Sequence, residues 1–469
     1  MSNKEIKYPK FAVVGHPNKG KSSIVSSLAL DNSVQIGDTP GTTQVHRSFP
    51  LKVDNKIIYE LFDTPGFQRA RQILAWLKKH EPASANKRVD VVKAFIAKHR
   101  DNPRFKDEVE LLEPIVEGAG IIYVVDASKP YGAEYEIEME ILRWCGQPSM
   151  AILNLIGDED YREDWTRALG QYFRLVRTFD PMKAKFSDHI SLLEAMAQLN
   201  EDWTKSIKKA INILKNMHRH KVEQTIDIVV EYVIKSLSYV YIKRIRTPEA
   251  TPQEKERAIE KYKEQLIKFE KRLERDIESI WQHVGVKKNK EELALDNIGL
   301  FSKQSASIFG LSQKEVAITG ASAGAIGGLG IDLAFGGGTL FLASLIGGAV
   351  GGVGAIMGFD NLYEMRVMGR KVGKKEIRVG PMKNINFPYI LLGRSLYYAY
   401  VISNRSHAMR EALELKDNNF PIEKLFDADS RRELEKVHAK LREEIKPSES
   451  MIEEYKGIVL KNYLDFLES

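Results

Sequence analysis

The sequence predicts an α/β domain with a mostly parallel, doubly wound sheet over residues 9–200, followed by an all-α domain over residues 201–469. Two observations predict the first domain. Short, continuously apolar runs alternate with helical patterns, and a glycine-rich loop joins the first of these runs to a helix. The second domain is predicted by a change of pattern near Glu201, after which apolar residues recur every three or four positions over long stretches.

The composition excludes several classes of protein. Its 70 Lys and Arg residues are nearly matched by 64 Asp and Glu, so the net charge of +6 is too small for a polycation that binds nucleic acid along its whole length. Cys145 is the only cysteine, which excludes an internal disulfide and a multi-cysteine metal site. Because no apolar segment precedes the first predicted strand, we expect a cytoplasmic protein.

The loop after the first apolar run reads Gly-His-Pro-Asn-Lys-Gly-Lys-Ser over residues 15–22, here called the phosphate loop. Glycines at its two ends let backbone N–H groups wrap around phosphates, while Lys21 reaches the β- and γ-phosphates and the Ser22 hydroxyl binds Mg²⁺. The run at residues 11–14 predicts a strand, and residues 22–28 predict a helix whose N-terminus faces the phosphates. We therefore predict a nucleotide site that includes Gly15, Asn18, Lys19, Gly20, Lys21, Ser22 and Ser23.

A turn-rich segment at residues 37–43 lies between this helix and a predicted hairpin at residues 45–53 and 56–62. A threonine in such a mobile loop can complete the Mg²⁺ shell with its hydroxyl and contact the γ-phosphate with its backbone. We choose Thr43 for this role, with Thr42 as the alternative.

The predicted hairpin ends in Asp-Thr-Pro-Gly at residues 63–66. Asp63 is expected to hold Mg²⁺ through water, and Gly66 to bring its N–H to the γ-phosphate and to pivot when that phosphate leaves. Together the motifs assign catalysis to Lys21, Thr43 and Gly66, and the metal to Ser22, Thr43 and Asp63.

These three motifs, at residues 15–22, 40–43 and 63–66, resemble those of GTPases of the translation-factor superclass, most of all the Era and TrmE branch. The resemblance covers roughly residues 9–200 and implies a P-loop G domain that binds GTP and GDP with Mg²⁺. The later part is similar to a bacterial group in which such a G domain is fused to a C-terminal domain of unknown function.

The resemblance carries two consequences for hydrolysis. Phe67 stands where Ras-like proteins place a water-orienting glutamine, so intrinsic hydrolysis is expected to be slow. In the Era and TrmE branch, an asparagine at the position of Asn18 helps to coordinate potassium in place of an arginine finger, and the resemblance implies the same here. The alternative is that Asn18 only shapes the loop.

A charged insertion at residues 68–118 separates the second motif from the next strand. Apolar residues at helical spacing predict three short helices, near residues 72–77, 89–97 and 109–116. The insertion is interpreted either as a lever that reports the nucleotide state or as a lid on the sheet.

The guanine motif is incomplete. Apolar runs at residues 121–126 and 149–154 complete the predicted sheet, but the second is followed by Leu-Ile-Gly-Asp rather than Lys-x-Asp after Asn154. Asp158 can serve only if the loop holds one extra residue, so we favour GTP with weakened guanine selectivity. We assign the base to Asn154 and Asp158.

In the second domain, an apolar stripe at residues 259–284 faces a matching stripe at residues 222–240, which predicts an antiparallel helical hairpin. Residues 316–359 are almost entirely Gly, Ala, Ile, Leu and Val, and are predicted to form an apolar hairpin that enters or lies against a bilayer. A basic cluster that follows, up to residue 383, would meet anionic headgroups.

Three functions remain open. The first is a nucleotide switch whose helical domain engages a membrane or membrane protein through residues 316–383, peripheral on or inserted into the inner membrane. The second is an RNA- or ribosome-associated GTPase, although residues 324–327 lack the basic residue of a K-homology loop and no specific nucleic-acid signature is present. The third is a nucleotide-binding scaffold with little hydrolysis. The sequence does not predict the oligomeric state.

Overall fold

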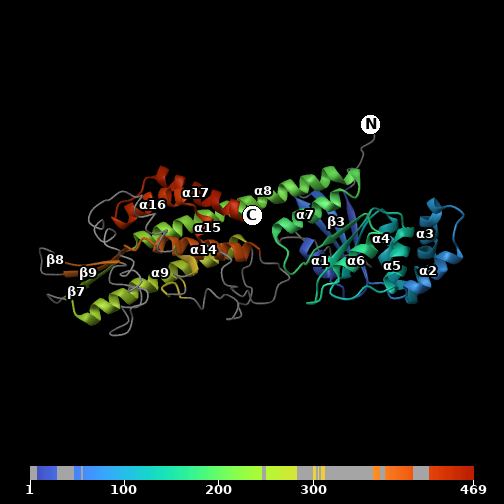
Figure 1. Cartoon of the computed structure of the whole chain (residues 1–469), viewed down its shortest axis with the longest axis horizontal. Helices are drawn as coiled ribbons and strands as arrows, with labels where there is room; N and C mark the ends of the chain where they lie inside the picture. Colours follow the sequence, from blue (N-terminus) through green and yellow to red (C-terminus); the bar gives the residue numbers. More distant parts are fainter. Residues whose placement is uncertain are drawn as a thin grey trace. The chain divides into compact units, whose positions relative to one another are not determined.

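The computed structural model describes residues 8–28, 47–53, 56–245, 250–281, 299–302, 305, 308–311, 363–369, 375–404 and 422–468. Thr42, Thr43 and the glycine-rich segment at residues 316–359 lie outside the described residues. The chain divides into unit 1, residues 1–217 with 404–410, and unit 2, residues 218–403 with 411–469. Figure 1 labels their helices and strands.

Unit 1 is built on a six-stranded sheet in the order β2-β3-β1-β4-β5-β6. Strand β2 runs antiparallel to β3, and the other neighbouring strands are parallel, as the sequence predicts. The parallel strands consist of apolar residues buried on both faces, which is why their sequences read as continuous apolar runs. The strands are β1 (Lys10–Val14), β2 (Arg47–Val53), β3 (Lys56–Asp63), β4 (Gly120–Asp126), β5 (Ser149–Asn154) and β6 (Leu175–Thr178).

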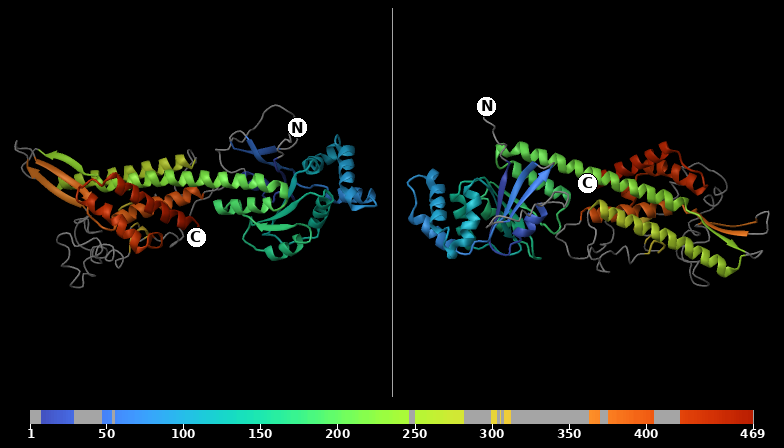
Figure 2. Two further views of the ribbon diagram at one scale, coloured as in Figure 1. Left: turned by 90° about the horizontal axis from the view of Figure 1, so that it is seen from above. Right: turned by 180° about the vertical axis from the view of Figure 1, so that it is seen from behind.

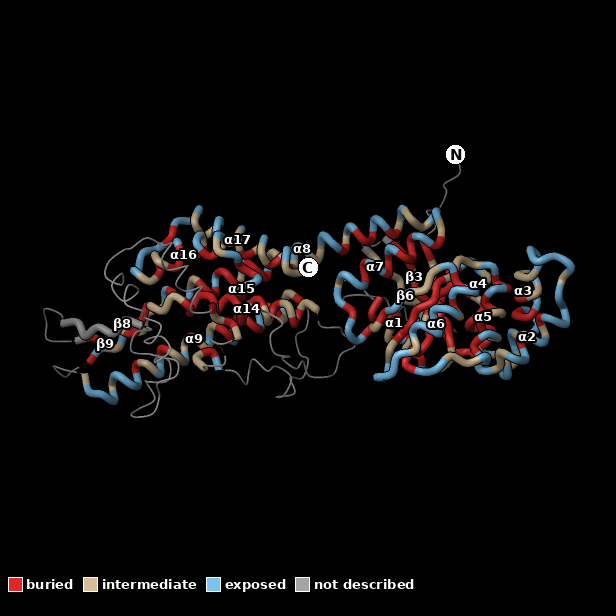
Figure 3. Tube along the Cα trace, in the orientation of Figure 1, coloured by how far each residue is buried: buried red, intermediate tan, exposed pale blue. Residues whose placement is uncertain are grey.

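Alternate residues of each strand enter two cores, so the sheet is doubly wound. Phe11 and Val13 of β1 pack with helices α1 (Lys21–Leu28), α7 (Phe186–Ala197) and the start of α8 (Glu201–Ser238). Ala12 and Val14 pack on the opposite face. Figure 3 shows these strands as buried. The helices of that face are α2 (Ala70–Lys79), α3 (Arg88–His99), α4 (Lys106–Val116), α5 (Glu134–Trp144) and α6 (Arg162–Leu169).

The insertion at residues 68–118 forms the three predicted helices, α2, α3 and α4, with short 3-10 turns at Ala85–Lys87 and Pro103–Phe105. Helices α2 and α3 lie side by side at one end of unit 1 (Figure 2). An aromatic contact joins them, because the rings of Trp76 and Phe95 meet edge-to-face with centroids 5.4 Å apart. Helix α4 instead packs on the sheet through Leu111, Leu112 and Ile115.

Unit 2 is largely helical, and its longest helices form the predicted antiparallel pair. Trp281, which follows α9 (Pro252–Ile280), donates its Nε1–H to Thr225 of α8 at 3.0 Å. Nearer the other ends of the two helices, Lys235 Nζ of α8 lies 4.7 Å from the ring centroid of Phe269. The remaining helices are α14 (Phe387–Ser403), α15 (Ile422–Leu425), α16 (Ala428–Arg442) and α17 (Glu449–Glu468).

Unit 2 also contains a three-stranded antiparallel sheet, β7-β9-β8, so the expectation of an all-α domain needs a correction. Its strands are β7 (Tyr241–Ile245), β8 (Tyr363–Gly369) and β9 (Lys375–Met382). Ile245, Ile377 and Val379 join the core of the unit. Among the described residues, no helix has both the length and the apolar character required to span a bilayer.

Candidate functional site

The phosphate loop connects the end of β1 to the first residue of α1. Gly15 has φ +145° and Gly20 has φ +83°, values that side chains rarely allow. A Cβ on Gly15 would also lie 2.4 Å from the carbonyl oxygen of Val124. Asn18 itself has φ +60°, a conformation that asparagine tolerates better than most residues. The loop therefore has the curvature that a phosphate-binding turn requires.

Lys21 lies under the curve of this loop. Its Nζ donates to the carbonyl oxygens of Gly15 at 3.2 Å and of His16 at 3.0 Å. Burial lowers the pKa of Lys21, while the negative charges of Asp63 and Glu138 oppose this shift. The ammonium group thus lies at the centre of the loop, where an anionic ligand would relieve its desolvation.

A hydroxyl and a carboxylate meet beside Lys21. Ser22 Oγ at the start of α1 donates to Asp63 Oδ2 at the end of β3, over 2.7 Å. This pair fits Mg²⁺, because oxygen donors of this kind are the ligands that Mg²⁺ prefers when it retains several waters. The cation would neutralise phosphate charge.

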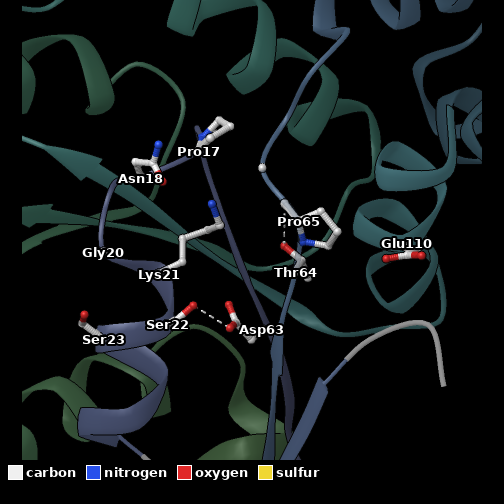
Figure 4. A pocket seen from close by; sticks show the side chains of 11 residues that line it. Pro17, Asn18, Gly20, Lys21, Ser22, Ser23, Asp63, Thr64, Pro65 and Glu110 are labelled. Carbon is white, nitrogen blue, oxygen red and sulfur yellow. Dashed lines mark hydrogen bonds between the residues drawn. The ribbon is translucent and has the colours of Figure 1, made fainter. Parts of the chain in front are cut away.

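The pocket at this point brings the predicted residues together from two segments (Figure 4). Gly66 packs so closely on the loop that a Cβ there would lie 2.6 Å from Pro17 N. Thr64 fixes the turn, since its Oγ1 donates to the Val13 carbonyl at 2.8 Å. The pocket is lined by Pro17, Asn18, Gly20, Lys21, Ser22, Ser23, Asp63, Thr64, Pro65, Gly66 and Glu110.

The two residues predicted to bind the guanine base, Asn154 and Asp158, lie in different surroundings. Asn154 is buried, and its Nδ2 donates to the Lys19 carbonyl at 3.2 Å, so it ties the end of β5 to the phosphate loop. Asp158 is exposed and does not line the pocket. Gly15, Lys19 and Asn154 support the pocket from outside its lining, while Thr43 lies outside the described residues.

Sequence reasoning missed an acidic residue at the end of β4. Asp126 is 2% exposed and accepts from Ser128 Oγ at 2.5 Å. It also forms a buried ion pair with Lys19 of the phosphate loop, whose Nζ lies 3.7 Å from Asp126 Oδ2. An acid at the carboxyl end of a central parallel strand is the signal that could have indicated it.

A second missed group supports the loop from α5. Glu138 is 3% exposed and accepts from Tyr123 OH at 2.9 Å, and its other oxygen lies 2.9 Å from His16 Nδ1. Burial raises the pKa of Glu138, although the contacts with His16 and Tyr123 oppose that shift. The sequence carries no signal for this trio, because 122 residues separate His16 from Glu138.

Helix α4 contributes two buried acids. Glu108 Oε1 accepts from the backbone N–H groups of Gln68 at 3.2 Å and Arg69 at 2.7 Å, just after Phe67. Glu110 reaches the pocket lining itself. Phe67 is 2% exposed and lies in the core, so its ring is packed away from the pocket.

Two family models match successive parts of the chain. Residues 10–154 match the model described as "50S ribosome-binding GTPase", and residues 166–457 match the model described as "Domain of unknown function (DUF3482)". The second match begins within α6, inside unit 1, and extends through most of unit 2.

Curated relatives match parts of this chain. GTPase Der of Agathobacter rectalis is 37% identical over 87 residues, which are 18% of this chain and 20% of that protein. The tRNA modification GTPase MnmE of Oceanobacillus iheyensis is 23% identical over 199 residues, 42% of each protein. The chain therefore spans less than half the length of these two relatives.

Among solved structures, Era of Aquifex aeolicus bound to GDP and AlF4⁻ has 17% sequence identity to this chain. The superposition covers 51% of this chain and 72% of that one, with a TM-score of 0.27.

Proposed function

We propose that this chain is a GTP-dependent switch with slow intrinsic hydrolysis. It belongs to the DUF3482 family and carries a translation-factor-type P-loop GTPase domain ahead of that family's region. The GTPase family implies GTP or GDP as the ligand, usually with Mg²⁺. One observation carries the proposal: Lys21, Ser22 and Asp63 converge on one pocket with the curved phosphate loop.

The residues of the pocket have separate tasks in this proposal. Lys21 and the loop N–H groups bind the β- and γ-phosphates, and Ser22, Asp63 and Thr43 hold Mg²⁺. Gly66 follows the γ-phosphate through its backbone N–H. Asn154 keeps the base-binding segment attached to the loop through Lys19. Asp158, which is exposed after β5, supplies a guanine contact weaker than that of a complete motif.

Equilibrium binding of fluorescent GTP and GDP tests the proposal directly, with and without Mg²⁺. We expect Mg²⁺-dependent binding of both nucleotides, and single-turnover hydrolysis at a low but measurable rate. A protein that binds neither nucleotide at millimolar concentration would contradict the assignment of the pocket.

Potassium stimulation is a finer part of the same proposal. Asn18 lines the pocket, and its side-chain carbonyl oxygen can help to hold a monovalent cation beside the phosphates. A cation there would stabilise the charge that develops during transfer. We expect hydrolysis about tenfold faster in KCl than in NaCl, or about 1.4 kcal/mol. Single-turnover assays at equal ionic strength measure this ratio.

The matched variant is Asn18→Gly, because glycine tolerates the backbone angle of Asn18 and removes only its side chain. The potassium response should disappear in this variant while GTP binding is kept. Equal rates of the parent in both salts would remove the cation from the proposal.

We further propose that the second domain, residues 201–469 in its predicted extent, engages a membrane or membrane protein through residues 316–383. The support is the apolar composition of residues 316–359 and the basic residues that follow. Two of those residues already have partners in unit 2, since Arg378 pairs with Glu444 at 2.9 Å and Lys383 donates to the Arg442 carbonyl. The other basic residues of this segment are Arg366, Arg370, Lys371, Lys374 and Lys375.

Flotation with liposomes tests this second part. We expect the parent protein to float with anionic vesicles, and a variant without residues 316–359 to stay at the bottom. The triple variant Arg370→Ala/Lys371→Ala/Lys374→Ala should float less with anionic vesicles, because each basic residue near the surface contributes about 1 kcal/mol. A parent that never floats, in any nucleotide state, would contradict membrane binding.

A second candidate function, association with RNA or the ribosome, is favoured by the positive charge of the first part of the insertion. Residues 68–106 carry eleven Lys and Arg against three Asp and Glu, whereas the whole chain has a net charge of +6. Lys98 Nζ lies 5.8 Å from the Trp76 ring, and His80 stacks on that ring at 4.0 Å, an arrangement compatible with base stacking. Fractionation of lysates separates the two candidates into membrane pellet and ribosome fractions.

A further inference from the structure

The pocket has an acidic wall that comes from the insertion. Helix α4 leads into β4 and packs on the sheet, with its first turns toward the edge where β1 and β3 end. Glu110 of α4 lines the pocket together with Lys21 and Gly66. Figure 4 shows Glu110 on its own helix, at the side of the pocket where Thr64 and Pro65 lie.

An ion pair within α4 involves Glu110, and the neighbouring Glu108 links that helix to the segment after Phe67. Lys106 lies one helical turn earlier and is exposed, and its Nζ is 3.7 Å from Glu110 Oε1. Glu108 is fully buried, and its Oε1 accepts both the Gln68 and the Arg69 N–H. The first turns of α4 are thereby attached to the segment that directly follows Phe67. This link restrains Glu110, which lies two residues after Glu108 on the same helix, relative to that segment.

Hydrolysis sets a chemical requirement that Phe67, at the position of the water-orienting glutamine, does not meet. Hydrolysis needs a group that accepts a hydrogen bond from the attacking water, and the buried phenyl ring of Phe67 offers none. Asp63 is engaged by the Ser22 hydroxyl at the opposite part of the site, where the metal would bind. Glu110 is the other carboxylate among the residues that line this pocket.

We propose that Glu110 is a catalytic residue whose carboxylate orients the attacking water, and that Glu108 is a positioning residue that holds α4 against the segment after Phe67. This inference rests on the proposed function, because it assigns a role within GTP hydrolysis. The water oxygen forms a bond to the γ-phosphorus while the bond from that phosphorus to the β–γ bridging oxygen breaks. The electron pair stays on GDP, and one water proton passes to Glu110 and then to phosphate or solvent.

A carboxylate beside a phosphate could instead repel it. The two roles predict opposite changes in the hydrolysis rate when Glu110 is replaced with the neutral residue Gln. A water-orienting Glu110 loses function as Gln, because the amide cannot take up the proton. A repelling Glu110 gains function as Gln, because the unfavourable charge is removed. The sign of the change therefore decides between them.

The experiment is single-turnover hydrolysis of saturating GTP by the full chain, with GTP affinity measured in parallel. We expect Glu110→Gln to reduce the rate about 100-fold, within the range typical of proton-transfer groups, and to leave the Kd for GTP within about twofold. Glu110→Asp should be slower than the parent and faster than Glu110→Gln. The matched control is Glu113→Gln on the same helix, whose carboxylate pairs with Arg100 at 2.7 Å and does not line the pocket.

For Glu108→Gln we expect faster amide exchange at Gln68 and Arg69, together with a lower hydrolysis rate at an unchanged Kd for GTP. A loss of global stability would not produce this combination.

An unchanged or raised hydrolysis rate in Glu110→Gln, or an equal loss in Glu113→Gln, overturns the assignment of Glu110. If the parent binds GTP but does not hydrolyse it, the proposed hydrolysis fails and this inference fails with it. If the parent hydrolyses GTP and Glu110→Gln does so equally, only the inference fails.

Discussion

Replacing Lys21 with alanine is expected to weaken GTP binding by at least about 100-fold, a loss of about 2.7 kcal/mol. The ammonium group lies at the centre of the phosphate loop, where it holds the carbonyl oxygens of Gly15 and His16. Burial lowers the pKa of Lys21 because it removes water from around the ammonium group. The negative phosphates of a bound nucleotide would favour the charged ammonium again, so the two groups should bind each other strongly. Isothermal titration with GTP and Mg²⁺ measures the change.

The control is Lys205→Ala, which removes the same charge from an exposed position on α8. Its affinity for GTP should equal that of the parent. The melting temperature of Lys21→Ala without nucleotide should stay near the parent value, because a desolvated charge is removed from the loop. Tight GTP binding by a folded Lys21→Ala protein would show that the phosphates bind elsewhere.

Most of unit 1 could be predicted from the sequence because its signals are local. The phosphate loop is a continuous segment between a strand and a helix, and its glycines are required by φ angles of +145° and +83° at Gly15 and Gly20. The parallel strands are short apolar runs because both faces of the sheet are covered. Even the helices of the insertion follow from apolar spacing within single segments.

The groups that the sequence did not reveal are those that depend on contacts between distant segments. Glu138 and Tyr123 support His16 from α5 and β4, and Glu108 holds the segment after Phe67 from α4. In the sequence each is an ordinary charged or aromatic residue of a helix or strand. Only the fold shows that these side chains are buried, and that Glu138 contacts the phosphate loop while Glu108 contacts the segment after Phe67.

The small sheet of unit 2 was missed for a related reason. Strand β7 is only five residues long, and its partner β9 lies more than 120 positions later in the chain. Its apolar residues do not alternate with polar ones, because Ile242 is apolar although it is 51% exposed, while Ile245 is buried. Such a strand becomes recognisable only when its partner is known.

Helix α14 is an apolar helix that lies inside the core of unit 2. Residues 389–402 are mostly apolar or aromatic, and the core of unit 2 buries this helix on nearly all sides. A charged residue, Arg394, lies in its middle. That residue leads to the second large effect expected here.

Replacing Arg394 with methionine is expected to destabilise unit 2 by about 3–5 kcal/mol, the cost of leaving a buried charge without its partner. Arg394 is 4% exposed, and its Nε donates to Glu270 Oε1 of α9 at 2.6 Å. It also donates to Ser305 Oγ at 3.3 Å. Methionine fills a similar volume, so the loss reflects the uncompensated carboxylate rather than a cavity. Amide exchange in α9 and α14 should accelerate by about 150-fold or more, since 3 kcal/mol corresponds to that factor.

Two variants separate the buried charge from a general effect of losing an arginine. Arg394→Met/Glu270→Leu removes both charges and should recover most of the protection, because a well-packed apolar pair can replace a buried ion pair. Arg432→Met breaks the exposed pair with Asp429, which is 2.8 Å apart, and should leave exchange almost unchanged. If Arg394→Met exchanged like the parent, or if the double variant were no more protected than the single one, then the charge on Glu270 would not be what makes Arg394 necessary.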